Sequence, residues 1–172
     1  ALGVNIEPGA PLIMSEVEVN IGSDANLFSS VLADLPIAAG DQLNQKLYEE
    51  IKTNLSTRAV EMGFFTARFE RSQLLLDLQE NSARASIDFN PGERYRFGEV
   101  QLQSIDFLSD DFIRKFVNLE EGAYYSSAAL IELRNSLNES QYFSNVTVTP
   151  ALSANQDSRV PINVALEPRP RH

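Results

Sequence analysis

An internal repeat constrains the fold of this chain more than any other feature of its sequence. The pair Pro8-Gly9 recurs as Pro91-Gly92, and the pair Glu16-Val17 recurs as Glu99-Val100, both 83 positions later. Self-similarity at a fixed period indicates that one structural unit is built more than once. We therefore expect two copies of a unit of about 80 residues.

The offset between the copies shortens along the chain. Gly40 corresponds to Gly122 at an offset of 82, whereas Gly63-Phe64-Phe65 corresponds to Gln141-Tyr142-Phe143 at an offset of 78. This difference equals about one turn of an α-helix. The long helix of the second copy is therefore expected to be one turn shorter than that of the first.

The repeat also predicts domain boundaries. The first copy occupies residues 9–91 and the second occupies residues 92–170, with almost no linker between them. The opening pattern Val4-x-Ile6-x-Pro8 corresponds to the end of a copy. Residues 1–8 are therefore expected to be the last strand of a preceding repeat.

Each copy has the pattern of a strand, two helices and two further strands. In the first copy, residues 15–21 alternate apolar and polar side chains, as a half-buried strand does. Ser23-Asp24 is a candidate N-cap for a short helix. Residues 44–62 carry an apolar stripe at helical spacing, and Gly63 lies where a helix end favours a left-handed residue.

The second copy repeats this order. Ser109 is placed to begin the short helix, and Ser126 or Ser127 to cap the longer one. Apolar residues of the longer helix recur at helical spacing, at Leu130, Leu133 and Leu137. The expected fold class is α+β, with a small sheet covered on one face by two helices in each copy.

Composition excludes most catalytic chemistry. The chain has no Cys and one His, which excludes thiol nucleophiles, disulfides, Cys/His zinc sites and His-based catalysis. Adjacent carboxylates such as Asp110-Asp111 do not form an acid–base pair, because neighbours on a helix point apart and negative charge favours a first helical turn. We expect no enzyme activity, no metal and no cofactor. The net charge of −10 also disfavours a nucleic-acid partner.

Basic and aromatic residues alternate in Arg94-Tyr95-Arg96-Phe97, between Gly92 and Gly98. Proteins that bind single-stranded nucleic acid show such alternation, but one cluster in an acidic chain favours cation–π packing or a seam between the copies. The glycines precede a strand, and no Gly-Lys-Ser/Thr follows them, so we interpret them as turn residues rather than a phosphate loop.

A three-stranded sheet has two edge strands, whose unpaired backbone groups can form hydrogen bonds with a strand of another chain. The candidate edge of the first copy runs from Phe65 to Gln79 and contains Leu74-Leu75-Leu76. Its counterpart, from Phe143, contains Pro150, which removes a donor and is tolerated mainly on edges. The edge of the first copy is therefore better suited to pair with another strand. The alternative interpretation is that this edge has only a structural role and is protected from pairing by its charged residues.

The order of elements, the Pro-Gly pair before the opening strand, and the Gly-Phe-Phe and Gln-Tyr-Phe after the long helices resemble POTRA domains. These are the periplasmic modules ahead of the barrel in the BamA/TamA superfamily. More narrowly, residues 91–100 are similar to the start of the last POTRA domain of the TamA family. The residues that carry this motif are Gly92, Arg94, Tyr95, Arg96, Phe97 and Gly98. The resemblance covers nearly the whole chain and implies the second and third TamA-type domains, each with a three-stranded mixed sheet.

The resemblance implies a non-catalytic scaffold at the periplasmic face of the outer membrane of a Gram-negative bacterium. It further implies a C-terminal outer-membrane β-barrel in the same chain, an inner-membrane-anchored TamB-like partner, and unfolded outer-membrane proteins or autotransporters as clients. POTRA domains receive such chains by β-augmentation at a sheet edge. The edge positions that correspond in this sequence are Phe65, Ala67, Phe69, Val146 and Val148.

Other functions of the same kind of domain remain open. One alternative is a substrate-recognition module of a two-partner secretion transporter or of BamA. Another is a POTRA-like interaction module of a division protein or other envelope protein.

Overall fold

A computed structural model describes residues 10–103, 105–106, 108–154 and 157–170. The chain forms two compact units, which we call unit 1 and unit 2. Unit 1 consists of the chain up to Arg58 together with Ala67–Gly92, and unit 2 of Ala59–Thr66 together with the chain from Glu93. The inclusion of Ala59–Thr66 in unit 2 was not expected from the sequence. The strand expected at residues 1–8 lies outside the described residues.

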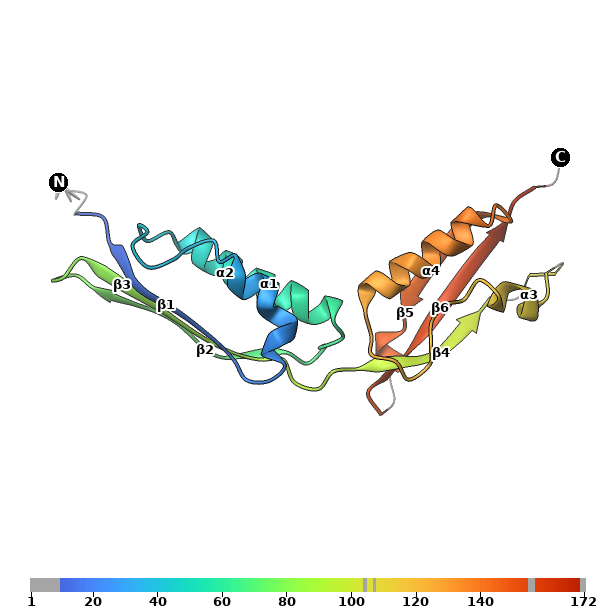
Figure 1. Cartoon of the computed structure of the whole chain (residues 1–172), viewed down its shortest axis with the longest axis horizontal. Helices are drawn as coiled ribbons and strands as arrows, with labels where there is room; N and C mark the ends of the chain where they lie inside the picture. The colour runs from blue at the N-terminus through green and yellow to red at the C-terminus, as the bar shows by residue number, and fades with distance from the viewer. Residues whose placement is uncertain (1–9, 104, 107, 155–156, 171–172) are drawn as a thin grey trace, which may run out of the picture. The chain divides into compact units, whose positions relative to one another are not determined.

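Unit 1 is a three-stranded mixed sheet with helices on one side (Figure 1). Its elements are β1 (Ile13–Ile21), the 3₁₀ helix η1 (Ala25–Phe28), α1 (Ser29–Ala33), α2 (Gln45–Glu61), whose end belongs to unit 2, β2 (Arg68–Asp77) and β3 (Ser82–Asn90). The strand order is β1-β3-β2. The central strand β3 runs parallel to β1 and antiparallel to β2.

Unit 2 repeats this topology. Its elements are β4 (Arg96–Leu102), α3 (Asp110–Arg114), α4 (Ser127–Glu139), β5 (Phe143–Pro150), η2 (Leu152–Ala154) and β6 (Arg159–Pro168). The strand order is β4-β6-β5, again with one parallel and one antiparallel pair. Helix α4 has 13 residues and α2 has 17, which confirms the expected loss of one turn. The expected α+β class with mixed sheets is confirmed.

The apolar stripes of the long helices form the cores. Tyr48, Ile51, Leu55 and Ala59 of α2 are buried, as are Leu130, Leu133 and Leu137 of α4. In the central strands the residues that face the helices are also buried, including Ile87 in β3 and Val164 in β6. Burial of these side chains is the main stabilising term, at about 1.5–3 kcal/mol for each large one.

The helix ends follow the sequence only in part. The side chain of Asn44 accepts hydrogen bonds from the N–H groups of Lys46 (3.0 Å) and Leu47 (3.3 Å), and the Ser109 hydroxyl accepts one from the N–H of Phe112 (3.3 Å). Gly63 has the expected left-handed conformation, with φ of 88°. Asp24 is also left-handed and makes no side-chain cap, because a 3₁₀ turn, not an α-helix, follows it. Ser126 likewise makes no side-chain cap.

In the described part of the chain, every helix is too short or too polar to cross a membrane.

A β-bulge occurs at the same place in both opening strands. β1 shifts register against β3 between Met14 and Glu16, and β4 shifts against β6 between Phe97 and Val100. The bulge in unit 2 brings Gly98 close to β6. A Cβ added to Gly98 would lie 3.0 Å from the backbone N of Pro161 and 3.1 Å from the carbonyl C of Val160. Because both atoms belong to the central strand, the close approach requires glycine.

We predict that Gly98→Ala lowers the free energy of unfolding of unit 2 by about 1–3 kcal/mol, the usual cost of overpacking a tight site. Gly22→Ala is the matched control, because its Cβ would meet its nearest atom, the Phe89 carbonyl O, at an ordinary 3.6 Å. Urea unfolding followed by hydrogen exchange measures the free energy of unfolding of each unit separately. Equal stability of the two variants would contradict the steric role of Gly98.

Candidate partner-binding edges

The second strand of each unit lies at an edge of its sheet. Because β3 is central in unit 1 and β6 is central in unit 2, β2 and β5 each have a neighbour on one side only within their sheets. Strands β1 and β4 form the opposite edges. Strands β2 and β5 are therefore edge strands, and each presents a row of backbone groups.

The structure corrects the expected start of the first edge. Strand β2 begins at Arg68, so Phe65 and Ala67 precede it. The ring of Phe65 packs edge-to-face against Tyr95 and Tyr125, with centroid distances of 5.2 and 4.9 Å. A turn follows Gly63, whose backbone is left-handed. Strand β2 begins only after this turn, because the side chain of Phe65 packs against the core of unit 2. Among the residues expected at the edges, Phe69, Val146 and Val148 lie in β2 and β5.

Hydrogen bonds at the two ends of β3 determine which β2 residues turn their backbone outward. The carbonyls of Asn81 and Phe89 accept from Ile13 and Gly22, on the β1 side. Because backbone direction alternates along a strand, odd-numbered residues of β3 bond toward β1 and even-numbered residues toward β2. The β2 residues opposite odd-numbered β3 residues therefore direct their N–H groups away from the sheet. They are Phe69, Ser72, Leu74 and Leu76.

Backbone direction alternates in the same way along β5 and β6. The Pro161 carbonyl accepts from the N–H of Ala151 on the β5 side, so odd-numbered residues of β6 bond toward β5. Val146, Val148 and Pro150 lie opposite even-numbered residues and direct their backbone outward. Pro150 therefore costs no bond within the sheet, but it ends the row of outward donors in β5. Unit 2 therefore has a shorter row of outward donors than unit 1.

Strand β2 is charged at its start and apolar at its end. Arg68 pairs with Glu70 at 3.6 Å, and Arg71 pairs with Asp88 of β3 at 3.0 Å. At the other end, Leu75 and Leu76 are each 52% exposed, and Leu78 in the turn is 74% exposed. The exposed leucines and the outward N–H groups lie on the same stretch of strand, which suits it to pair with an extended apolar chain.

The basic and aromatic motif forms a packed cluster inside unit 2. The guanidinium carbons of Arg94 and Arg96 lie 4.5 and 3.9 Å from the ring centroid of Tyr124, which confirms cation–π packing. Arg96 also donates to the Gly122 carbonyl at 2.8 Å. Tyr125 is buried beside this cluster, and its burial raises the pKa of its hydroxyl above the ordinary value. The geometry therefore assigns the motif a structural role.

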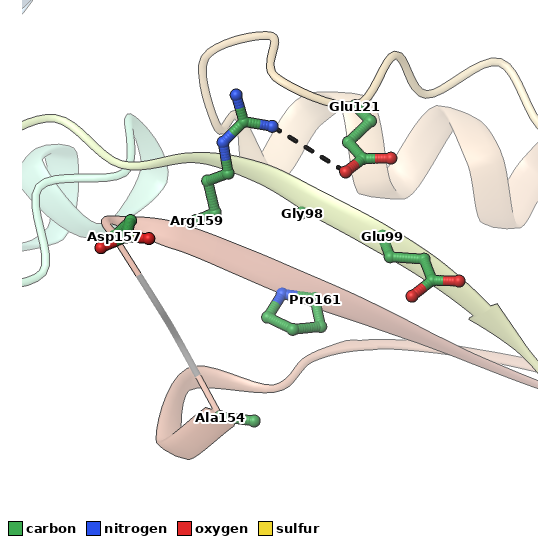
Figure 2. Close-up of a pocket in the computed structure, with 7 residues that line it drawn as sticks. All are labelled: Gly98, Glu99, Glu121, Ala154, Asp157, Arg159 and Pro161. Atoms are coloured by element: carbon green, nitrogen blue, oxygen red, sulfur yellow. Dashed lines mark ion pairs between the residues drawn. The ribbon is translucent and has the colours of Figure 1, made fainter.

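A shallow hollow lies beside Gly98 (Figure 2). Its lining residues are Gly98, Glu99, Glu121, Ala154, Asp157, Arg159 and Pro161. Arg159 pairs with Glu121 at 3.9 Å, and both side chains are about half exposed, so the pair is solvated and worth little. Among the lining residues that the structure describes, no nucleophile is paired with a base.

Residues 95–169 match the POTRA family, described as a surface antigen variable number repeat. Most of unit 2 therefore matches the POTRA family over these residues. Its match begins at Tyr95, inside the motif that the sequence singled out.

Solved structures share the fold over most of the chain. BamA POTRA3-5 of Haemophilus influenzae has a TM-score of 0.58 and 14% identity, covering 91% of this chain and 61% of that one. BamA of Haemophilus ducreyi lacking POTRA domains 1-3 has a TM-score of 0.63 and 16% identity, covering 91% and 29%. POTRA1-2 of Omp85 from Anabaena has a TM-score of 0.52 and 18% identity, covering 90% and 95%.

These likenesses extend the POTRA fold to unit 1, whose element order and sheet topology match those of unit 2. The chain therefore has the fold of two tandem POTRA domains. It spans 61% of one BamA chain and 29% of the other.

Leu75 and Leu76 give a matched test of the edge assignment, because both are 52% exposed while their N–H groups point in opposite directions. Leu75→Pro removes a donor that bonds to β3, and we predict that it destabilises unit 1 by at least about 2 kcal/mol more than Leu76→Pro does. Urea unfolding measures both. Equal losses would show that the outward direction is assigned incorrectly.

Proposed function

We propose that this chain is a non-catalytic scaffold that holds client chains in extended conformation along β2 and, more weakly, along β5. The observation that carries the proposal is the outward row of donors at Phe69, Ser72, Leu74 and Leu76, next to exposed leucines. A visiting strand obtains affinity from backbone hydrogen bonds and makes few demands on its own sequence. This suits a scaffold that must accept many clients.

For the parent protein, we propose a location at the periplasmic face of the outer membrane of a Gram-negative bacterium and a C-terminal β-barrel in the same chain. Support comes from the POTRA match of residues 95–169 and from the shared fold with BamA POTRA domains. The clients in this proposal are unfolded outer-membrane proteins.

We further propose the TamA type within this superfamily, with autotransporters among the clients and an inner-membrane-anchored TamB-like partner. The support is the motif from Gly92 to Gly98, which resembles the start of the last TamA POTRA domain. The alternative is a POTRA module of BamA or of a two-partner secretion transporter. The BamA alternative is kept because BamA POTRA domains have the same fold.

Client binding is tested with a soluble peptide of alternating apolar and polar residues, followed by NMR of the amide groups. We expect the largest shifts at Phe69, Ser72, Leu74 and Leu76. Leu76→Pro should weaken binding about 3- to 10-fold, the value of one hydrogen bond. Leu76→Ala is the control because it removes the same side chain but keeps the N–H. Equal weakening by both variants would contradict pairing through the backbone.

The parent protein is tested in isolated outer membranes by gel mobility with and without boiling. A heat-dependent shift is expected because a folded β-barrel resists unfolding by detergent. Absence of a shift, with the protein in the inner membrane or a soluble fraction, would contradict the barrel and leave an envelope interaction module.

A photoreactive residue in place of Phe69 then separates the types. Crosslinks to an inner-membrane-anchored protein are expected for the TamA type. Crosslinks to one dedicated secreted protein would favour the two-partner alternative, and crosslinks to diverse barrel precursors alone would favour BamA.

A further inference from the structure

A short segment from the end of α2 completes the core of unit 2. The N–H of Tyr95 donates to the Gly63 carbonyl at 2.9 Å, and the Phe65 ring packs on Tyr95 and Tyr125. A Cβ added to Gly63 would lie 2.8 Å from the Cβ of Tyr125. In unit 2, a loop therefore packs on Tyr95 and Tyr125. Its residue nearest to Tyr125 is a glycine, and an aromatic residue follows two positions later.

Unit 1 has the same receiving backbone. In unit 2 the N–H of Tyr125 donates to the Tyr95 carbonyl at 3.0 Å, and in unit 1 the N–H of Leu43 donates to the Leu12 carbonyl at 2.7 Å. An isolated antiparallel bridge follows in each, Arg96 with Tyr124 and Ile13 with Gln42. Further equivalent bonds of 2.8 Å join Phe97 N to Ala123 O and Met14 N to Asp41 O. Leu12 and Leu43 therefore stand where Tyr95 and Tyr125 receive the loop.

Exposure differs between the two receiving sites. Tyr125 is 4% exposed, whereas its counterpart Leu43 is only half-buried. Ile13, next to Leu12, is 41% exposed. The loop from Gly63 to Phe65 belongs to unit 2. The described residues of unit 1 include no equivalent loop.

We propose that Leu12 and Leu43 form a docking site for the Gly-x-aromatic loop of another POTRA domain placed directly upstream. The glycine carbonyl of that loop accepts from the N–H of Leu12, as Gly63 accepts from Tyr95. The docking loop needs glycine at this position, because the Cβ of Leu43 would lie against it as the Cβ of Tyr125 lies against Gly63. This inference rests on the repeated geometry and does not depend on client binding.

The site differs from its occupied counterpart in two ways that define the occupant. Leu12 and Leu43 are smaller than the two tyrosines at the equivalent positions. The side chain that docks on them must therefore be a bulky aromatic one, which fills the volume that the tyrosine rings occupy in unit 2. Pro11 replaces Arg94, whose guanidinium donates to the Met62 carbonyl at 2.8 Å in unit 2. Docking at unit 1 therefore depends on the apolar contact and one backbone bond, without the arginine.

The test places an upstream copy of residues 10–92 before Ala10, in place of residues 1–9, so that Gly92 is joined to Ala10. Leu12 then follows the upstream Gly63 at the spacing with which Tyr95 follows Gly63 in the natural chain. The chain has no Cys, so Leu43→Cys in the downstream copy reports access to N-ethylmaleimide. We expect alkylation at least about tenfold slower than in the unextended chain, as for a site open less than a tenth of the time.

Matched variants separate docking from other causes. Leu75→Cys in the same copy should react equally in both chains. Upstream Phe65→Ala should restore fast alkylation of the cysteine at position 43, and upstream Phe65→Leu should keep most of the protection, with folding of each checked by circular dichroism. The proposal is overturned if alkylation is equally fast with and without the upstream copy. It is also overturned if protection survives Phe65→Ala or rises with protein concentration, since the latter indicates association between copies.

Discussion

Each unit depends on hydrogen bonding along both sides of its central strand. β3 and β6 alternate their backbone groups between a parallel neighbour and an antiparallel neighbour, so these two strands bond on both sides. Two properties of the sheets follow from this arrangement. It makes β2 and β5 edges, and it determines which of their N–H groups point outward.

The same constraint explains the residues that depart from ordinary strand composition. Pro161 lies in a central strand, where a missing donor is normally costly. Its carbonyl accepts from the N–H of Ala151 on the β5 side, so its nitrogen also faces that side, where β5 has already ended at Pro150. Pro150 lies at an outward position of an edge, where its missing N–H removes nothing from the sheet. In both strands the proline is tolerated because its missing N–H faces a place where the sheet has no neighbouring strand to bond.

Much of the fold follows from local pattern. Alternation predicted the opening strands, helical spacing predicted the buried residues of α2 and α4, and the shortened offset predicted the shorter second helix. The residues of the edge strands were predicted less well. Phe69, Val146 and Val148 lie in the edge strands, but Phe65 and Ala67 precede β2 because the turn after Gly63 places Phe65 against Tyr95 and Tyr125. Apolar alternation does not show whether an aromatic side chain begins a strand or fills a distant core.

The sequence by itself determined the repeat, the order of elements, the buried faces and the absence of thiol and disulfide chemistry, because each of these is a property of local spacing or of composition. Tertiary structure alone decided which strand is central, which N–H groups face outward, and that residues 59–66 are part of the second unit. Those features depend on pairings between segments far apart in the chain. Pairing is set by register and packing, which no single segment encodes.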